Sequence, residues 1–172
     1  MPFHPLVTTM LSDQADHAIH LLCDVAEEKY GTDNDEWAAI RNKAKDILEE
    51  EGFEYIDTGT YRLVYKTPDG ESVIKIAKNM KTGVLENQSS VENWFDAKDA
   101  GVTERLATLY EYDDEYRWIL QEYVNNTSPD DTRIELLKDD LQQHSVHISE
   151  IDHWNTGKRS DGTAVLLDYG GM

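Results

Sequence analysis

The stretch EIDHWNTGKRSDGTAVLLDYG, at residues 150–170, contains two polar segments around one short apolar run. Residues 149–157 predict a loop, and Ser160-Asp161-Gly162 is a strong turn signal. The apolar residues 164–167 predict a short strand that stops at Asp168-Tyr169-Gly170. The end of the chain is therefore expected to form a loop, a tight turn and a final strand.

Other strands are expected in segments rich in β-branched and aromatic residues: 53–67, 72–77, 105–112 and 116–124. The turn signal Pro68-Asp69-Gly70 separates the first two, and residues 113–115 are expected to close a tight hairpin between the last two. The strand at 72–77 carries Lys75 in its middle. A buried cation is costly unless it is paired, so this lysine needs a partner.

Apolar residues recur at helical spacing in four segments: 8–30, from Asn34 or Asp35 to Glu51, 84–99, and around Ile134, Leu137 and Leu141. Gly31, Gly52 and Gly101 follow the first three and are typical helix terminators. The chain is therefore predicted to be an α+β protein. Its first two helices form a helical extension at residues 1–52.

The order of the remaining parts resembles the protein-kinase fold. Residues 56–66 are similar to the glycine-rich loop of that family, and Val73-Ile74-Lys75 is similar to its V-A-I-K strand. Gly59 matches the middle glycine of the loop, whereas Asp57 and Arg62 replace two others. Both side chains would hinder close approach of the backbone to phosphates.

The resemblance implies that Lys75 binds nucleotide and pairs with a glutamate on the next helix. Glu92 is the first candidate, and Glu86, nearer the helix start, is the reserve. The alternative is that the Lys75 side chain extends to a sheet edge while Glu92 lies in solvent.

Gln121-Glu122-Tyr123-Val124 looks like the hinge at which the family holds adenine through backbone hydrogen bonds. The resemblance implies that Glu122 and Val124 contact the nucleotide and that Gln121 is the gatekeeper. An edge strand that ends in a polar loop explains the same residues without a nucleotide.

The stretch at 150–170 is similar to the family's catalytic loop and its Asp-Phe-Gly motif. The resemblance implies that Asn155 and Asp168, thirteen residues apart, hold magnesium, and both supply the hard oxygen ligands that this ion prefers. Glu150 stands at the position of the catalytic base, with Asp152 as a second carboxylate. The alternative is a pair of acidic turns without metal.

The resemblance covers residues 53–170, so we expect this chain to lack the helices that bind peptide substrates in ordinary protein kinases. We expect a truncated kinase-like domain at residues 53–172, with a sheet lobe at 53–124 and a helix and metal-loop remnant at 125–172. The condensed pattern is similar to kinase-like proteins of tailed viruses and haloarchaea. The helical extension is expected to brace the sheet.

The composition is strongly acidic, with 16 Lys plus Arg, 35 Asp plus Glu and a net charge of −19. Such a charge excludes nucleic-acid binding through a basic patch. The acidic residues are dispersed, which favours a protein adapted to molar salt over one whose acidic face meets a basic partner. No membrane-spanning run or signal peptide is expected, so we expect a cytoplasmic or virion location in a high-salt environment.

A zinc site is disfavoured. Cys23 is the single cysteine, so it can form no intramolecular disulfide. His17, His20 and Cys23 fall at helical spacing, but a fourth ligand is not apparent.

Two functions remain open. The first is a pseudokinase-like binding or structural module, part of a haloarchaeal virus particle or another assembly, whose partners are other proteins. The second is a minimal phosphotransferase that uses ATP and Mg²⁺ on a small molecule, a protein or itself. The sequence does not give the oligomeric state, the substrate or the partner.

Overall fold

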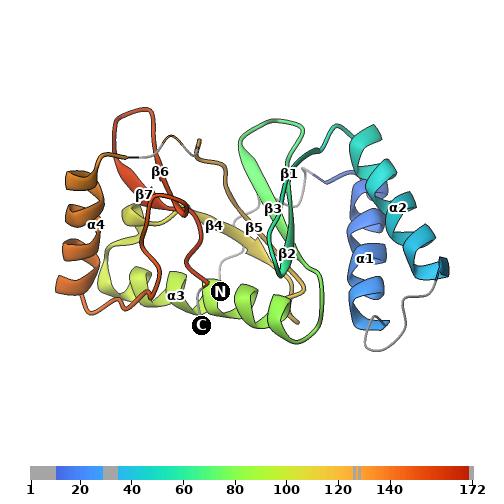
Figure 1. Ribbon diagram of the computed structural model, residues 1–172, viewed down its shortest axis with the longest axis horizontal. Coiled ribbons are helices and arrows are strands. Elements are labelled where there is room, and N and C mark those ends of the chain that lie inside the picture. Colours follow the sequence, from blue (N-terminus) through green and yellow to red (C-terminus); the bar gives the residue numbers. More distant parts are fainter. Residues whose placement is uncertain (1–10, 29–34, 126, 128, 171–172) are drawn as a thin grey trace.

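The computed structural model describes residues 11–28, 35–125, 127 and 129–170. Within these residues the helices are α1 (Asp13–Glu28), α2 (Asp35–Glu50), α3 (Thr82–Ala100), the short 3-10 helix η1 (Thr103–Arg105) and α4 (Asp131–Gln143). The strands are β1 (Glu54–Thr58), β2 (Arg62–Lys66), β3 (Ser72–Ala77), β4 (Leu109–Tyr112), β5 (Trp118–Glu122), β6 (Thr156–Lys158) and β7 (Ala164–Leu166). Figure 1 shows α1 and α2 at one end of the molecule and α4 at the other, with the main sheet between them.

The main sheet has the strand order β1-β2-β3-β5-β4, and every neighbouring pair is antiparallel. Side chains alternate between its two faces. One face packs against α1 and α2 and forms the first core, which includes Ile19, Leu48, Tyr65, Ile74 and Leu120. The opposite face carries Lys75 and Ile119, and Ile119 packs with Val91 of α3. The sheet is therefore covered on both faces.

Helix α3 is held at both ends. The Asn79 side-chain oxygen accepts hydrogen bonds from the backbone N–H groups of Lys81, Thr82 and Gly83 at 2.7–3.2 Å, which satisfies the free donors of the first turn. Gly101 ends the helix with φ +76°, a left-handed conformation that favours glycine. A Cβ atom at Gly83 would lie 2.6 Å from the Tyr61 carbonyl oxygen, so the helix start approaches the β1–β2 loop more closely than any side chain would permit.

The second core lies between the end of α3, α4 and β7, and includes Ala97, Leu106, Leu137, Leu141 and Leu166. Strands β6 and β7 form a two-stranded antiparallel sheet, with Gly157 opposite Val165. Asp130 caps α4 by accepting a 2.9 Å hydrogen bond from the Arg133 backbone N–H. These contacts fix the segment that carries Asn155 and Asp168.

The α+β class, the N-terminal helical pair and the antiparallel strands are confirmed. The expected strand at 105–112 is wrong in its first part, because Leu106 and Ala107 are buried against β7, where Ala107 N–H donates to the Leu166 carbonyl at 2.9 Å. The loop expected at 149–157 ends early, since β6 begins at Thr156. The start of the first expected helix, Gly31 and the candidate cap Asn34 lie outside the described residues.

None of the described helices has both the length and the apolar character that crossing a membrane requires.

Candidate functional site

Four charged side chains from four parts of the chain meet between the main sheet and the end of β7. They are Arg62 of β2, Lys75 of β3, Glu86 of α3 and Asp168, and together they form what we call the charge cluster. The Arg62 guanidinium donates to the Asp168 carboxylate, and the same Arg62 nitrogen lies 3.8 Å from a Glu86 oxygen. The Lys75 ammonium lies 3.8 Å from the other Asp168 oxygen.

The register of the sheet places both cations on one face. Val64 is opposite Lys75, and Arg62 precedes Val64 by two residues, so Arg62 and Lys75 point to the same side. Their side chains are only 7% and 8% exposed. Buried cations of this kind are costly unless carboxylates and hydrogen bonds compensate them.

Lys75 is fixed by a second contact. Its ammonium donates a 2.8 Å hydrogen bond to the Leu167 carbonyl, which also accepts one of 2.8 Å from the Gln121 side chain. Burial lowers the pKa of Lys75 to about 8, although the Asp168 carboxylate works in the opposite direction. The Gln121 side-chain oxygen is buried without a hydrogen-bond partner among the described residues, which leaves an unsatisfied acceptor beside Lys75.

The pKa values of the two carboxylates in the charge cluster shift in opposite directions. Burial alone would raise the pKa of Asp168, but Lys75 and Arg62 hold it well below its ordinary value. For Glu86 burial prevails, so its pKa is raised even though Arg62 opposes this. Asp168 is therefore the anionic centre that both cations compensate.

The expected pairing of Lys75 with Glu92 is not formed. Glu92 is exposed on α3 and accepts a 2.9 Å hydrogen bond from the Gln88 side chain. The reserve candidate, Glu86, is the one that faces the charge cluster. The two glutamates are six residues apart, and at roughly 100° per residue they point to different sides of the helix.

The Asn155 side chain is used within its own loop. Its oxygen accepts a 3.1 Å hydrogen bond from the Asp152 backbone N–H, and its amide nitrogen donates to the carbonyls of Glu150 and, at 3.2 Å, Asp168. Asn155 therefore ties the loop to the end of β7 through backbone groups. In this arrangement the oxygen that would bind a metal is already engaged.

The two candidate bases lie on the surface of the same loop. The Asp152 carboxylate accepts from the backbone N–H groups of Trp154, at 2.8 Å, and Asn155, at 3.1 Å, so it shapes the turn. Glu150 is exposed and contributes its carbonyl to Asn155. In the part of the chain that the structure describes, no group of three or more His, Cys, Asp or Glu side chains is arranged to hold a metal ion.

The candidate hinge residues have structural contacts. The Glu122 carboxylate forms a bidentate pair with the Arg159 guanidinium, at 2.9 and 2.7 Å, and accepts two 3.0 Å hydrogen bonds from Thr108. Arg159 also donates to the Leu106 carbonyl at 3.1 Å, so it joins the β6–β7 hairpin to the main sheet. Val124 is buried in the second core, and the Gly59 carbonyl accepts a 3.1 Å hydrogen bond from Lys78.

Sequence reasoning missed two members of this arrangement. Arg62 was identified only as the replacement of a glycine, and no local pattern indicates that its side chain reaches a carboxylate 106 residues away. Arg159 gave no signal either, because a single arginine in a polar turn is ordinary. The presence of Lys75 in a buried strand was the one signal that pointed to a paired site.

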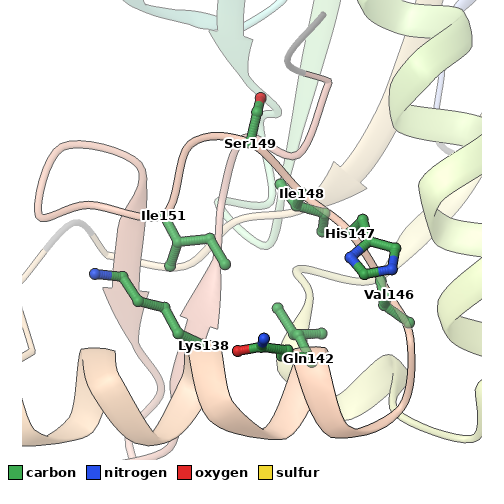
Figure 2. Close-up of a pocket in the computed structure, with 8 residues that line it drawn as sticks. Lys138, Gln142, Val146, His147, Ile148, Ser149 and Ile151 are labelled. Carbon is green, nitrogen blue, oxygen red and sulfur yellow. The ribbon is translucent and has the colours of Figure 1, made fainter.

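Three cavities of about 500, 440 and 320 Å³ are lined by residues outside the charge cluster. Figure 2 shows the first, between Lys138 and Gln142 of α4 and the segment that carries Ile148 and Ile151. The sequence matches no protein-family model and no curated protein. The geometry of the charge cluster is therefore the main indication of function.

Proposed function

We propose that this chain is a kinase-fold binding or structural module without ordinary protein-kinase activity. The observation that carries the proposal is the contact between the Arg62 guanidinium and the Asp168 carboxylate. A cation supplied by the chain itself stands where the resemblance implies a magnesium ion. The charge cluster then joins the sheet to the C-terminal segment, as a structural role requires.

The charges around Asp168 support this role. A magnesium ion at this carboxylate would meet the positive charges of both Arg62 and Lys75. Two unit charges 4 Å apart repel by about 4 kcal/mol at an effective dielectric constant near 20, and the repulsion is larger for a divalent ion. Metal binding would therefore require Arg62 to leave.

The loop around Asn155 supports it as well. Its amide group accepts one hydrogen bond from the Asp152 backbone and donates to the backbone carbonyls of Glu150 and Asp168. A metal at the Asn155 oxygen would share that oxygen with the Asp152 N–H and so compete with this hydrogen bond. The loop is thus built to hold its own shape.

The architecture is consistent with a kinase-like origin. The resemblance implies a small antiparallel sheet with its helix, and the five-stranded sheet with α3 has this composition. In this proposal, helix α4 and the β6–β7 hairpin take the place of the helix and metal-loop remnant. The partners we propose are other proteins of a high-salt assembly such as a haloarchaeal virus particle, and Trp154, 86% exposed beside Asp152, is a suitable contact residue.

A minimal ATP- and Mg²⁺-dependent phosphotransferase is the second candidate. Lys75 and Asp168 lie 3.8 Å apart, as that function needs, and the buried Gln121 oxygen could accept a hydrogen bond from the adenine amino group. Lys75 would hold the phosphates, and Asp168 would hold the metal. Arg62 and Asn155 do not fit, because both engage the groups that the nucleotide and the metal require.

Calorimetry with ATP in molar KCl, with and without Mg²⁺, tests the proposal. We expect no saturable binding to the wild type, and none to Lys75→Met. A matched control is Lys43→Met, which removes an exposed lysine of α2. Binding that requires both Mg²⁺ and Lys75, and that Lys43→Met leaves unchanged, would overturn the module and favour the phosphotransferase.

A further inference from the structure

A third cavity, of about 320 Å³, lies on the face of the sheet opposite the charge cluster, between the helical pair and the ends of β2 and β3. Its lining combines apolar and cationic side chains. The apolar residues are Leu22, Val25, Ala26, Leu63 and Ala77, and the cations are Arg41, Lys45 and Lys78, with Asn42 beside them.

The charge of this lining differs from that of the chain as a whole. Asp and Glu outnumber Lys and Arg by 35 to 16 in the sequence, yet among the described residues the lining contains three cations and no carboxylate. The cations come from two different elements, since Arg41 and Lys45 lie one turn apart on α2 and Lys78 follows β3. An ordinary solvated surface of this protein would present acidic residues here.

The three cations are close enough to repel one another. Burial lowers the pKa of Lys45, and the neighbouring charges of Arg41 and Lys78 lower it further, while Glu49 of the next turn opposes them. The Lys45 ammonium lies 5.9 Å from the centre of the Tyr55 ring, and Lys78 donates to the Gly59 carbonyl. An anion in the cavity would relieve this repulsion.

We propose that this cavity binds a small organic anion, a phosphate monoester or carboxylate that carries a compact apolar group. The cations would hold the anionic group, and the apolar residues of α1, β2 and β3 would cover the remainder. The volume is at the lower end of the roughly 300–1,000 Å³ typical of small-molecule sites. The proposal does not depend on the function proposed for the charge cluster, because the two sites share no residue.

Calorimetry with four probes tests both halves of the site. Phenyl phosphate and benzoate carry an anionic group and a ring, inorganic phosphate carries the charge alone, and phenol carries the ring without the charge. The titrations use the lowest KCl concentration at which far-UV circular dichroism shows the native fold, because chloride competes for cations. Phenyl phosphate and benzoate distinguish a phosphate ligand from a carboxylate ligand.

We expect saturable binding of at least one of the two ring-bearing anions, and weaker binding of inorganic phosphate and phenol. Arg41→Gln and Lys45→Gln should each weaken it by about tenfold or more, as the loss of a charged hydrogen-bond donor predicts. Lys43→Gln is the matched control, since it removes one exposed cation from the same helix outside the cavity. It should change the affinity by less than about twofold, because exposed charges are screened.

Three results would overturn the proposal. One is no saturable binding of either ring-bearing anion to the wild type. Another is equal binding of inorganic phosphate, which would indicate an adventitious ion only. The third is an equal loss of affinity in Lys43→Gln and Arg41→Gln, which would indicate a response to net charge. If Lys45→Gln alters the circular dichroism spectrum, Arg41→Gln decides, because it leaves the contact between Lys45 and the Tyr55 ring in place.

Discussion

The Arg62 guanidinium donates to the Asp168 carboxylate across 106 residues of sequence, and so joins the second strand of the main sheet to a position two residues beyond the end of β7. Lys75 reinforces this connection through Asp168 and the Leu167 carbonyl. The two parts of the domain are thus held together by charged side chains in addition to the apolar cores. The first consequence concerns stability.

Arg62→Gln should destabilise the fold, because it leaves Glu86 without its cation and Asp168 with Lys75 alone. Breaking a fully buried pair costs about 3–5 kcal/mol, but Asp168 is 42% exposed and solvent screens its charge, so we expect about 1–3 kcal/mol. Urea unfolding at constant KCl measures the change. The matched control is Arg133→Gln, whose pair with Asp130 is 45% and 61% exposed and should contribute at most about 0.5 kcal/mol. Equal effects of the two substitutions would contradict the role assigned to Arg62.

Asp168→Asn should flatten the acid limb of the stability profile. Lys75 and Arg62 hold the pKa of Asp168 below its ordinary value even though burial opposes them, so the unfolded state takes up the proton first as pH falls. The stabilisation is fully present above the pKa that Asp168 has in the unfolded state, about 3.9. It is lost as pH falls toward the lower pKa of Asp168 in the folded state. Urea unfolding from pH 6 to pH 3 should show a smaller loss in Asp168→Asn than in the wild type. Asp46→Asn, at an exposed position of α2, is the control and should follow the wild type.

Lys75 shows most clearly how much of this site the sequence predicts. A lysine in the middle of an apolar strand indicates a buried cation that needs a partner, and this part of the prediction is confirmed. The expected partner on α3 is not the one that Lys75 has: its ammonium lies 3.8 Å from Asp168, while Glu86 faces Arg62 and Glu92 is exposed. The inner face of α3 carries Asn87 and Ser90, both buried, so apolar spacing does not mark that face. On a helix of mixed polarity, the tertiary packing decides which residue faces a buried charge, and the local sequence does not show it.

The sequence predicted more of the fold than of the site. Segments rich in β-branched and aromatic residues predicted the strands of the main sheet, and the turn residues around Gly70 and Gly162, both with positive φ, predicted two of the connections. The segment at Leu106 was assigned to a strand because it is apolar, but its burial comes from contact with β7, 60 residues later. Long-range contacts of this kind leave no local pattern, and Arg62 and Arg159 are further examples.

Gly83→Ala should destabilise the protein although alanine favours helices. The new Cβ would lie 2.6 Å from the Tyr61 carbonyl and 3.0 Å from the Ala77 side chain, so α3 would have to shift from the β1–β2 loop. Overpacking of this kind costs about 1–3 kcal/mol. At the upper end of this range the cost exceeds the gain of about 1 kcal/mol in helix propensity. Thermal unfolding should show a lower Tm. Gly59→Ala is the comparison, since its Cβ would meet only the Arg62 carbonyl at 3.7 Å, and a larger loss there would contradict this account.

Lys75→Met should remove a pH dependence on the alkaline side. Burial lowers the pKa of Lys75 to about 8 from an ordinary value of 10.5, so between these values the unfolded state binds more protons than the folded state. Below the folded-state pKa, the buried Lys75 ammonium is charged and destabilises the folded protein. This destabilisation is relieved as pH rises and the ammonium loses its proton. The unfolding free energy of the wild type minus that of Lys75→Met should therefore rise from pH 7 to pH 10. A difference that stays flat or falls, measured by urea unfolding, would show that Lys75 is not desolvated.

The last prediction concerns salt. At a net charge of −19 the folded chain repels itself, and screening extends over about 10 Å at 0.1 M salt but only about 3 Å at 1 M. Far-UV circular dichroism should therefore show loss of helical signal near about 0.1 M KCl and recovery toward about 3 M. Helices α1 and α2 should respond first, because each has acidic residues in its last turns without a basic residue there, which opposes the helix dipole.

The control for salt is sucrose, which favours compact states by exclusion from the protein surface but does not screen charge. If repulsion between carboxylates limits stability, sucrose in 0.1 M KCl should restore less of the signal than KCl does at the concentration that gives full recovery. Equal recovery in sucrose would assign the effect to general compaction. A spectrum unchanged across the KCl range would show that the apolar cores and the charge cluster outweigh the repulsion, and would remove the argument for a high-salt environment.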